Sequence, residues 1–295
     1  MELWIPITIA AAFLQNLRSV LQKHLKSRLS TAGATVSRFI FAVPVALTVL
    51  AMLKFGLGYD IPTPNAGFLT YGMVGAIMQI TATFLLVYLF GLRNFAVGTT
   101  FSKTEAVQTA VVGYLVLSEK ISTYAIVGIL VSLVGVVVIS SPGGLRKGLF
   151  SRSAGIGIAS GAAFGISAVS YRAASLSLDT GDFLIRGATL LAFTTVFQTV
   201  LMLIYLALRE RGQTRAVLIN WRIGALVGLT GGMASLGWFT AMTLQNAAYV
   251  RALAQVELLF TLVASWLIFK EKTSARELAG MGLILGGILV LVLLR

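Results

Sequence analysis

Ten apolar stretches, each long enough to cross a lipid bilayer, follow one another along this 295-residue chain. A bilayer core is about 30 Å thick, and about 20 residues of α-helix cross it. The predicted spans are residues 3–23, 35–53, 68–91, 95–117, 121–141, 154–173, 183–208, 221–243, 247–269 and 275–294. Only 11% of the residues are charged, whereas a soluble protein has about 25%. We therefore expect an all-α membrane protein with ten transmembrane helices, the first of them retained rather than cleaved as a signal peptide.

An internal repeat divides the chain into two halves. Residues 92–139 align without a gap with residues 244–291, at an offset of 152, and 14 of the 48 pairs are identical. The identical pairs include Glu105 with Glu257, Gly128 with Gly280, and Gly135 with Gly287. Because each half holds five spans, an odd number, the second half must cross the membrane in the opposite orientation. We predict two inverted repeats around a central cavity, residues 1–141 and 154–295, joined by a basic linker at 142–153, and the glycines indicate close helix packing.

The basic residues predict the orientation in the membrane. The chain has a formal net charge of +13, which in a soluble protein would point to nucleic acid, but here the Lys and Arg residues stand mostly between apolar runs. Of the 23, 14 belong to the odd-numbered loops, three to the opposite side and six to the spans. The side richer in Lys and Arg is cytoplasmic by the positive-inside rule. We therefore expect a multi-pass protein of the cell inner membrane with both termini external, and no nucleic-acid partner.

The sequence offers no recognisable catalytic or cofactor motif. There is no cysteine, and the only histidine, His24, lies among Lys and Arg residues at the predicted cytoplasmic rim. The glycine runs lie inside apolar stretches rather than between a strand and a helix, so they are not nucleotide-binding loops. We expect no metal, no cofactor and no enzymatic activity.

Two glutamates are the most informative residues in the spans. Glu105 and Glu257 each lie ten residues into a predicted helix, which places them about 15 Å deep, near the bilayer midplane. Carboxylates at that depth face the protein interior, where they form a pair, take up a proton or bind a cation. The repeat brings both to one cavity, so we predict a substrate-binding or coupling role, with a structural hydrogen bond from a protonated Glu as the alternative.

Lys103 is the third charged residue at this depth. It lies two positions before Glu105, so the two side chains leave the helix in nearly opposite directions. Three alternatives stay open for its ammonium group: a substrate carboxylate, a pair with Glu257 across the cavity, or extension toward the cytoplasmic interface. Its equivalent in the second half is the neutral Gln255, so charge recognition must be asymmetric.

Other residues are expected to line the cavity. Arg251 shares a helix face with Gln255, and the remaining candidates have polar-tipped or aromatic side chains that could contact a ligand ring or cation. They are Gln79, Tyr88, Tyr171 and Trp238. The other four arginines within the spans lie closer to a membrane face, and we expect them to extend toward it. They are Arg18 and Arg38 on the cytoplasmic side, and Arg172 and Arg186 on the external side.

The repeat carries a family resemblance. Glu105 is followed after 13 residues by Glu119-Lys120, Glu257 by Glu271-Lys272, and a glycine stands nine residues after each second Glu. In this the chain resembles the EamA repeat of the drug/metabolite transporter superfamily, in which Glu-Pro is common where this chain has Glu105-Ala106 and Glu257-Leu258. The resemblance implies ten helices in two inverted repeats, alternating access, and export of amino acids, other metabolites or drugs.

The function expected from these features is transport of a small molecule. The combination of Lys103, Glu105 and Glu257 would suit a zwitterion, with aromatic residues for its side chain. We expect an exporter of aromatic or neutral amino acids, or of similar metabolites, acting as a monomer. Alternatives are efflux of hydrophobic organic cations, and a non-transporting scaffold or lipid-handling enzyme.

Overall fold

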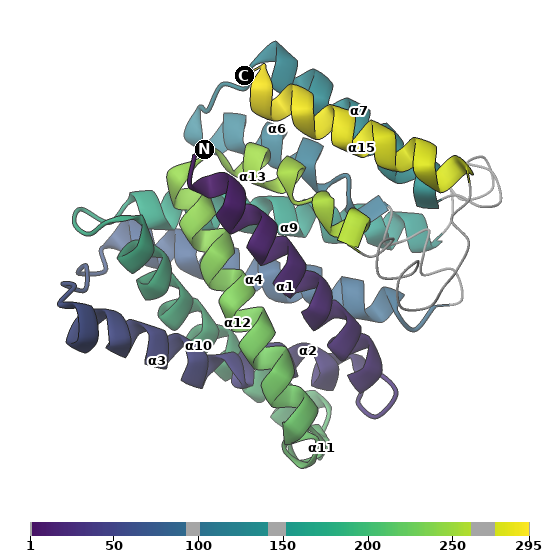
Figure 1. The fold of residues 1–295 in the computed structure, drawn as a ribbon. Coiled ribbons are helices and arrows are strands. Elements are labelled where there is room, and N and C mark those ends of the chain that lie inside the picture. The colour runs from purple at the N-terminus through teal and green to yellow at the C-terminus, as the bar shows by residue number, and fades with distance from the viewer. Residues whose placement is uncertain (1, 93–100, 141–151, 261–274, 295) are drawn as a thin grey trace.

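The structure, a computed structural model, is a bundle of helices (Figure 1). It describes residues 2–92, 101–140, 152–260 and 275–294, and no strand occurs in these ranges. Six helical segments are long and apolar enough to cross a membrane. They are α1 (Trp4–Leu25), Thr31–Gly56, α4 (Ala66–Leu89), α9 (Arg152–Leu176), α10 (Phe183–Arg209) and α12 (Trp221–Leu244). The described part is therefore that of a multi-pass membrane protein.

Shorter elements complete the described residues. The segment Thr31–Gly56 consists of α2 (Thr31–Ile40), α3 (Ala42–Ala51) and a π-helix, η1 (Met52–Gly56). The others are α6 (Glu105–Leu117), α7 (Thr123–Ser140), α11 (Gln213–Ile219), α13 (Ala247–Leu253) and α15 (Ala275–Leu293). The positions of the predicted spans thus agree with the helices to within a few residues, but two spans are not continuous. Residues 95–100 and 261–269 of these two predicted spans lie outside the described residues. In the described parts, a turn interrupts the predicted helix at Lys103 and Thr104 and again at Ala254 and Gln255.

Local capping explains where several helices begin. Side-chain oxygens of Ser30, Asn65, Asp182 and Asn246 accept backbone N–H groups in the first turns of α2, α4, α10 and α13. These groups have no partner within the helix, and a cap is worth about 1 kcal/mol. Polar capping residues between apolar runs therefore determine the residue at which each of these helices begins.

Packing between the two halves follows an approximate twofold relationship. At the offset of 152, α1 corresponds to α9, and α4 corresponds to α12. The pair α1 and α12 packs together, as does the equivalent pair α9 and α4. Helices α7 and α15 lie side by side (Figure 1). A Cβ atom on Gly128 would lie 2.6 Å from the carbonyl oxygen of Gly287, and one on Gly135 would lie 2.7 Å from that of Gly280. The repeated glycines thus contact one another crosswise, as two antiparallel helices on a twofold axis require, and the predicted close packing is confirmed.

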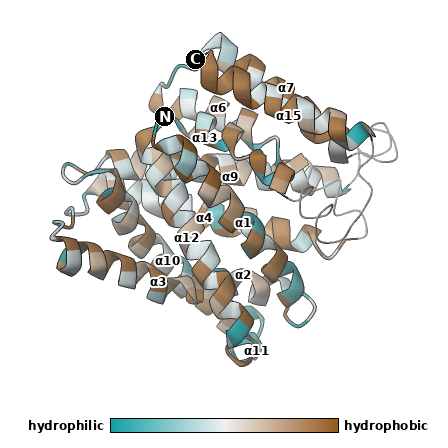
Figure 2. Ribbon diagram, viewed as in Figure 1, coloured by the Kyte–Doolittle hydropathy of each residue, from teal (hydrophilic) through white to brown (hydrophobic). Residues whose placement is uncertain are grey.

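The outer surface of the bundle is largely apolar, and polar contacts occur at its ends. Hydrophobic residues cover most of the helices, and hydrophilic residues appear near α11 (Figure 2). Many large apolar side chains point outward, among them Phe13, Val20 and Leu208. At one end, the segment after α1 meets the segment before α11 through Ser30, which donates a hydrogen bond to Glu210. Apolar outer surfaces and polar ends are the distribution expected of a protein surrounded by lipid.

Candidate functional site

The two interrupted helices meet at the centre of the bundle. The helix before α6 ends at Ser102, and Lys103 and Thr104 form a turn before α6 begins at Glu105. In the second half α13 ends at Leu253, a turn follows at Ala254 and Gln255, and residues 256–260 are helical again. The breaks occur at equivalent positions, since Lys103 corresponds to Gln255. Thr104 and Ala254 keep right-handed helical backbone angles, and hydrogen bonds from Thr104 N–H to Phe101 and from Gln255 N–H to Ala252 span three residues instead of four. Each break is therefore a short 3₁₀-like turn, a feature that often marks a functional hinge within a helix.

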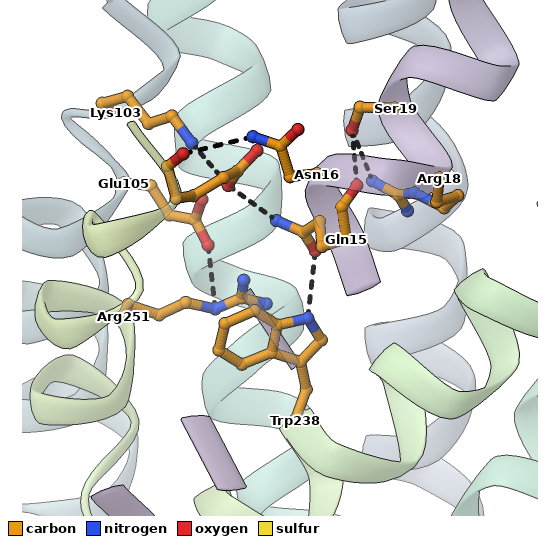
Figure 3. Close-up of polar contacts among 9 residues, drawn as sticks. Gln15, Asn16, Arg18, Ser19, Lys103, Glu105, Trp238 and Arg251 are labelled. Carbon is orange, nitrogen blue, oxygen red and sulfur yellow. Dashed lines mark hydrogen bonds and ion pairs between the residues drawn. The ribbon is translucent and has the colours of Figure 1, made fainter. Parts of the chain in front are cut away.

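Two ion pairs cross between the halves at these breaks (Figure 3). Lys103 Nζ lies 2.9 Å from Glu257 Oε2, and Arg251 Nε lies 2.9 Å from Glu105 Oε1. We call these two contacts the crossed pairs. Of the three roles considered for the ammonium group of Lys103, the structure shows the ion pair with Glu257. Each half supplies one cation and one carboxylate, so the crossed pairs join the two halves where their helices are broken.

The two crossed pairs differ in their hydrogen-bond geometry. Lys103 donates a hydrogen bond to Glu257, whereas Arg251 Nε and Glu105 Oε1 are close but not aligned for one. Within the described part of the chain, neither of these two atoms has another hydrogen-bond partner. The guanidinium carbon of Arg251 also lies 5.0 Å from the ring centre of Trp238, a cation–π contact. Arg251 is therefore held as much by the indole ring as by the carboxylate.

Helix α1 supports this centre with neutral polar side chains. Gln15 donates to Glu257 Oε2 at 3.3 Å and accepts from the indole N–H of Trp238 at 3.0 Å. Asn16 donates to the backbone oxygen of Glu257 at 3.1 Å, just after the turn at Ala254 and Gln255. Sequence reasoning missed both residues. The available signal was a run of polar residues, Gln15-Asn16-x-Arg18-Ser19, inside an apolar span.

A cavity of about 200 Å³ opens beside the crossed pairs. Its polar wall includes both crossed pairs, and its apolar wall comes from α4, α9 and the segment after the second break. The lining residues are Gln15, Arg18, Ser19, Leu86, Phe90, Ser102, Lys103, Glu105, Phe164, Arg251, Glu257 and Leu258. A polar wall facing an apolar one suits a small amphiphilic solute.

Gln255 lies beside this cavity, in a second cavity of about 20 Å³ that Gln15 and both crossed pairs also line. The side chain is 3% exposed, and among the described residues neither its Nε2 nor its Oε1 atom has a hydrogen-bond partner. A buried amide without partners costs about 1–3 kcal/mol. Such a group next to four charged residues is a candidate for ligand contact or for rearrangement during transport.

Arg18 and Arg38 do not extend to the membrane face, and that expectation is wrong. Arg18 is 2% exposed and Arg38 is 3% exposed. Arg38 donates to the hydroxyls of Thr83 at 2.9 Å and Ser235 at 3.4 Å. Both side chains pack against Gly231 of α12, where a Cβ atom would lie 3.1 Å from Arg18 and 3.5 Å from Arg38. The absence of a side chain at Gly231 lets the two arginines stay inside the bundle.

Two further candidates, Gln79 and Tyr171, lie apart from the crossed pairs. Tyr171 donates to Gln79 at 3.1 Å, and Gln198 donates to Gln79 at 2.9 Å and lies 3.2 Å from the hydroxyl of Tyr171. All three are buried, and they connect α4, α9 and α10. Neither Gln79 nor Tyr171 is among the residues that line the 200 Å³ cavity. The network satisfies buried polar groups and fixes three helices relative to one another.

The remaining predicted residues lie toward the ends of the bundle. Tyr88 accepts a hydrogen bond from Arg152 at 3.4 Å near the ends of α4 and α9. Arg172 pairs with Glu119 at 2.5 Å and donates to the carbonyl groups of Met242 and Gln245, so it ties chain segments together instead of extending to the interface as expected. Arg186 donates to the carbonyls of residues 180 and 181. In the described residues, no three His, Cys, Asp or Glu side chains come together as a metal site would need.

Comparison with known proteins supports the same architecture. The sequence matches the EamA-like transporter family over residues 2–141 and 153–293, once in each half. No curated protein matches the chain. Twenty-nine chains of solved structures do match. One crystal structure has 16% sequence identity and a TM-score of 0.74, with 99% of this chain and 96% of that chain aligned, which shows a shared fold. The family match covers nearly the whole chain, and with the crossed packing of its two halves it shows that this protein belongs to the EamA-like transporter family.

Proposed function

We propose that this protein exports amino acids or similar small metabolites across the inner membrane by alternating access. The observation that carries the proposal is the pair of charged contacts that cross between the two halves at broken helices, beside a cavity of about 200 Å³. Pockets for drug-sized ligands are about 300–1,000 Å³. A cavity below that range fits a metabolite better than a bulky drug.

The crossed pairs give a physical basis for alternating access. They hold the two halves together where each helix changes locally to hydrogen bonds that span three residues. Opening toward one side requires at least one pair to separate, which leaves charges buried unless a solute replaces the lost partner. A solute that offers a carboxylate and an ammonium group can do so, so its binding energy supports the change between states.

The orientation and assembly belong to the same proposal. We place both termini outside and the 142–153 linker in the cytoplasm, because 14 of the 23 Lys and Arg residues belong to the odd-numbered loops. We expect a monomer, since the cavity is formed within one chain. A reporter active only in the cytoplasm, fused to the C-terminus, should be inactive, and an active fusion would overturn this orientation.

The decisive experiment is solute counterflow with the purified protein in liposomes. Liposomes loaded with one unlabelled solute should accumulate the same labelled solute, from a panel of amino acids, organic cations and sugar phosphates. Lys103→Ala should abolish amino-acid flux, because Glu257 loses the cation with which it forms an ion pair inside the bundle.

Lys54→Ala is the matched control for Lys103→Ala. Lys54 lies in η1 outside the cavity, and this variant should transport as the wild type does. Absence of flux for every solute in the panel would overturn the transport proposal and favour a scaffold or lipid-handling role. Flux of organic cations that survives Lys103→Ala would instead favour the efflux alternative.

A further inference from the structure

The buried charges of the described helices do not cancel. Outside the Arg172–Glu119 pair, four cations and two carboxylates lie in the interior. The cations are Arg18, Arg38, Lys103 and Arg251, and the carboxylates are Glu105 and Glu257. With all six ionised, the interior carries a net charge of +2. A charge inside a bilayer costs several kcal/mol and is retained where it has a partner or a function.

The crossed pairs use both carboxylates, and Arg18 is left without one. Among the described residues its guanidinium has no ion-pair partner within 4.0 Å, its Nε atom has no hydrogen bond, and its Nη2 reaches only the hydroxyl of Ser19 at 3.5 Å. Arg18 nevertheless lines the 200 Å³ cavity and is 2% exposed. A fully buried arginine therefore faces a cavity with unused donors.

From this arrangement we propose that Arg18 binds an anionic group of the transported solute. The inference rests on the proposed transport function and narrows its substrate class. The solute carries a carboxylate or a phosphate, the two groups that match the planar fork of a guanidinium. Its remainder is apolar, because Leu86, Phe90 and Phe164 line the same cavity.

The same geometry indicates which part of the solute the other charged residues of the cavity contact. Lys103 stays with Glu257, with which it already forms an aligned hydrogen bond, and so is not the group that binds the anion. A solute ammonium group, where there is one, faces Glu105, whose Oε1 atom is not aligned with Arg251. Anions and zwitterions therefore fit the cavity, whereas a solute that is only cationic would add to its net positive charge.

Anion binding can be measured without knowing the natural solute. The full-length protein in detergent is unfolded thermally with increasing sodium acetate or sodium phosphate, against sodium chloride at the same ionic strength. A ligand that binds only the folded state raises the unfolding temperature in a saturable manner. We expect acetate, phosphate or both to raise the unfolding temperature in this way. The anion that does so identifies the chemical group, carboxylate or phosphate, that Arg18 binds.

Variants of Arg18 test the assignment. Arg18→Met should lose the saturable response and should not lower the unfolding temperature in chloride, since it removes a buried charge that forms no ion pair among the described residues. Arg18→Lys keeps the positive charge but lacks the planar guanidinium group, and its half-maximal response should need about tenfold more anion. This variant also tests the assignment if Arg18→Met does not fold. Arg186→Met, at the bundle end, should respond as the wild type does. No saturable response in the wild type, or equal responses with and without Arg18, would overturn the proposal.

Transport with a matched pair of solutes provides an independent check. Phenylalanine and phenylalaninamide differ in that the amide lacks the carboxylate and is a cation. Counterflow of phenylalanine without phenylalaninamide supports an anion requirement, and equal counterflow of both contradicts it while leaving the transport proposal intact. If neither moves and no other solute does, the transport proposal fails, while the unfolding assay still decides whether Arg18 binds anions.

Discussion

The antiparallel contact between α7 and α15 makes a prediction that two adjacent glycines can test. A Cβ atom on Gly287 would lie 2.5 Å from the carbonyl oxygen of Gly128 and 2.2 Å from the hydroxyl of Ser132, whereas one on Gly286 would meet nothing within 4 Å. An ordinary contact needs about 3.4 Å, so Gly287→Ala forces the helices apart by roughly 1 Å and loses the dispersion contacts around it. Gly286→Ala leaves the interface unchanged.

The magnitude follows from overpacking. Inserting one carbon into a close-packed interface costs about 1–3 kcal/mol. Exchanging Gly for Ala within a helix gains about 0.5–1 kcal/mol, but both variants gain it, so the difference between them isolates the contact. For a chain of this size, 1 kcal/mol changes the unfolding temperature by about 2 °C or slightly more. We expect Gly287→Ala to unfold several degrees below Gly286→Ala.

The assay is thermal unfolding of both variants and the wild type in one detergent, followed by intrinsic tryptophan fluorescence. Gly286→Ala should match or exceed the wild type. Equal unfolding temperatures for the two variants, or a lower one for Gly286→Ala, would show that α7 and α15 do not pack through these glycines. The crosswise contact of the two halves would then be wrong as well.

Two further predictions concern buried polar contacts. Tyr171→Phe removes the hydroxyl that contacts Gln79 and Gln198 and should cost about 1–3 kcal/mol of unfolding free energy; an unchanged unfolding temperature would show that the network contributes no stability. Glu105→Gln and Arg251→Met should each destabilise the protein, because each leaves one buried charge unpaired, while the double variant should recover part of the loss. Strictly additive effects on stability would contradict a direct pair between the two residues.

Much of the fold could be predicted from the sequence because the bilayer imposes it. Apolar runs bounded by capping residues such as Asn65 and Asp182 predicted helix positions to within a few residues. The offset of 152 predicted inverted repeats with close packing at the glycines, and the twofold relationship explains why equivalent glycines meet crosswise in the structure. The helix breaks at Lys103 and Gln255 could not be predicted, because neither proline nor glycine lies there to signal them. They depend on tertiary contacts, among them that of Asn16 with the backbone of Glu257.

The candidate site was only partly predictable, for a related reason. Depth along a helix placed Glu105 and Glu257 at the centre, and the repeat indicated that they share a cavity. Depth alone says nothing about the direction in which a side chain leaves its helix. Arg18 lies close enough to the cytoplasmic end of α1 to reach the interface, yet its side chain turns inward, because Gly231 on α12 provides the space. That space depends on a residue more than 200 positions away.

The crossed pairs also show how the two halves diverged without losing charge balance between them. Exact twofold symmetry would place a lysine at position 255 to meet Glu105, as Lys103 meets Glu257. The chain has Gln255 there, and Arg251, one helical turn earlier, reaches Glu105 instead. Because Arg251 approaches from a different position, its Nε is not aligned for a hydrogen bond, and the amide of Gln255 is left without a partner. The pair that departs from symmetry is thus the less constrained of the two, and it lines the same cavity as the unpaired Arg18. Separation of Arg251 from Glu105 therefore costs fewer hydrogen bonds than separation of Lys103 from Glu257, which makes it the step that a bound solute can drive most easily.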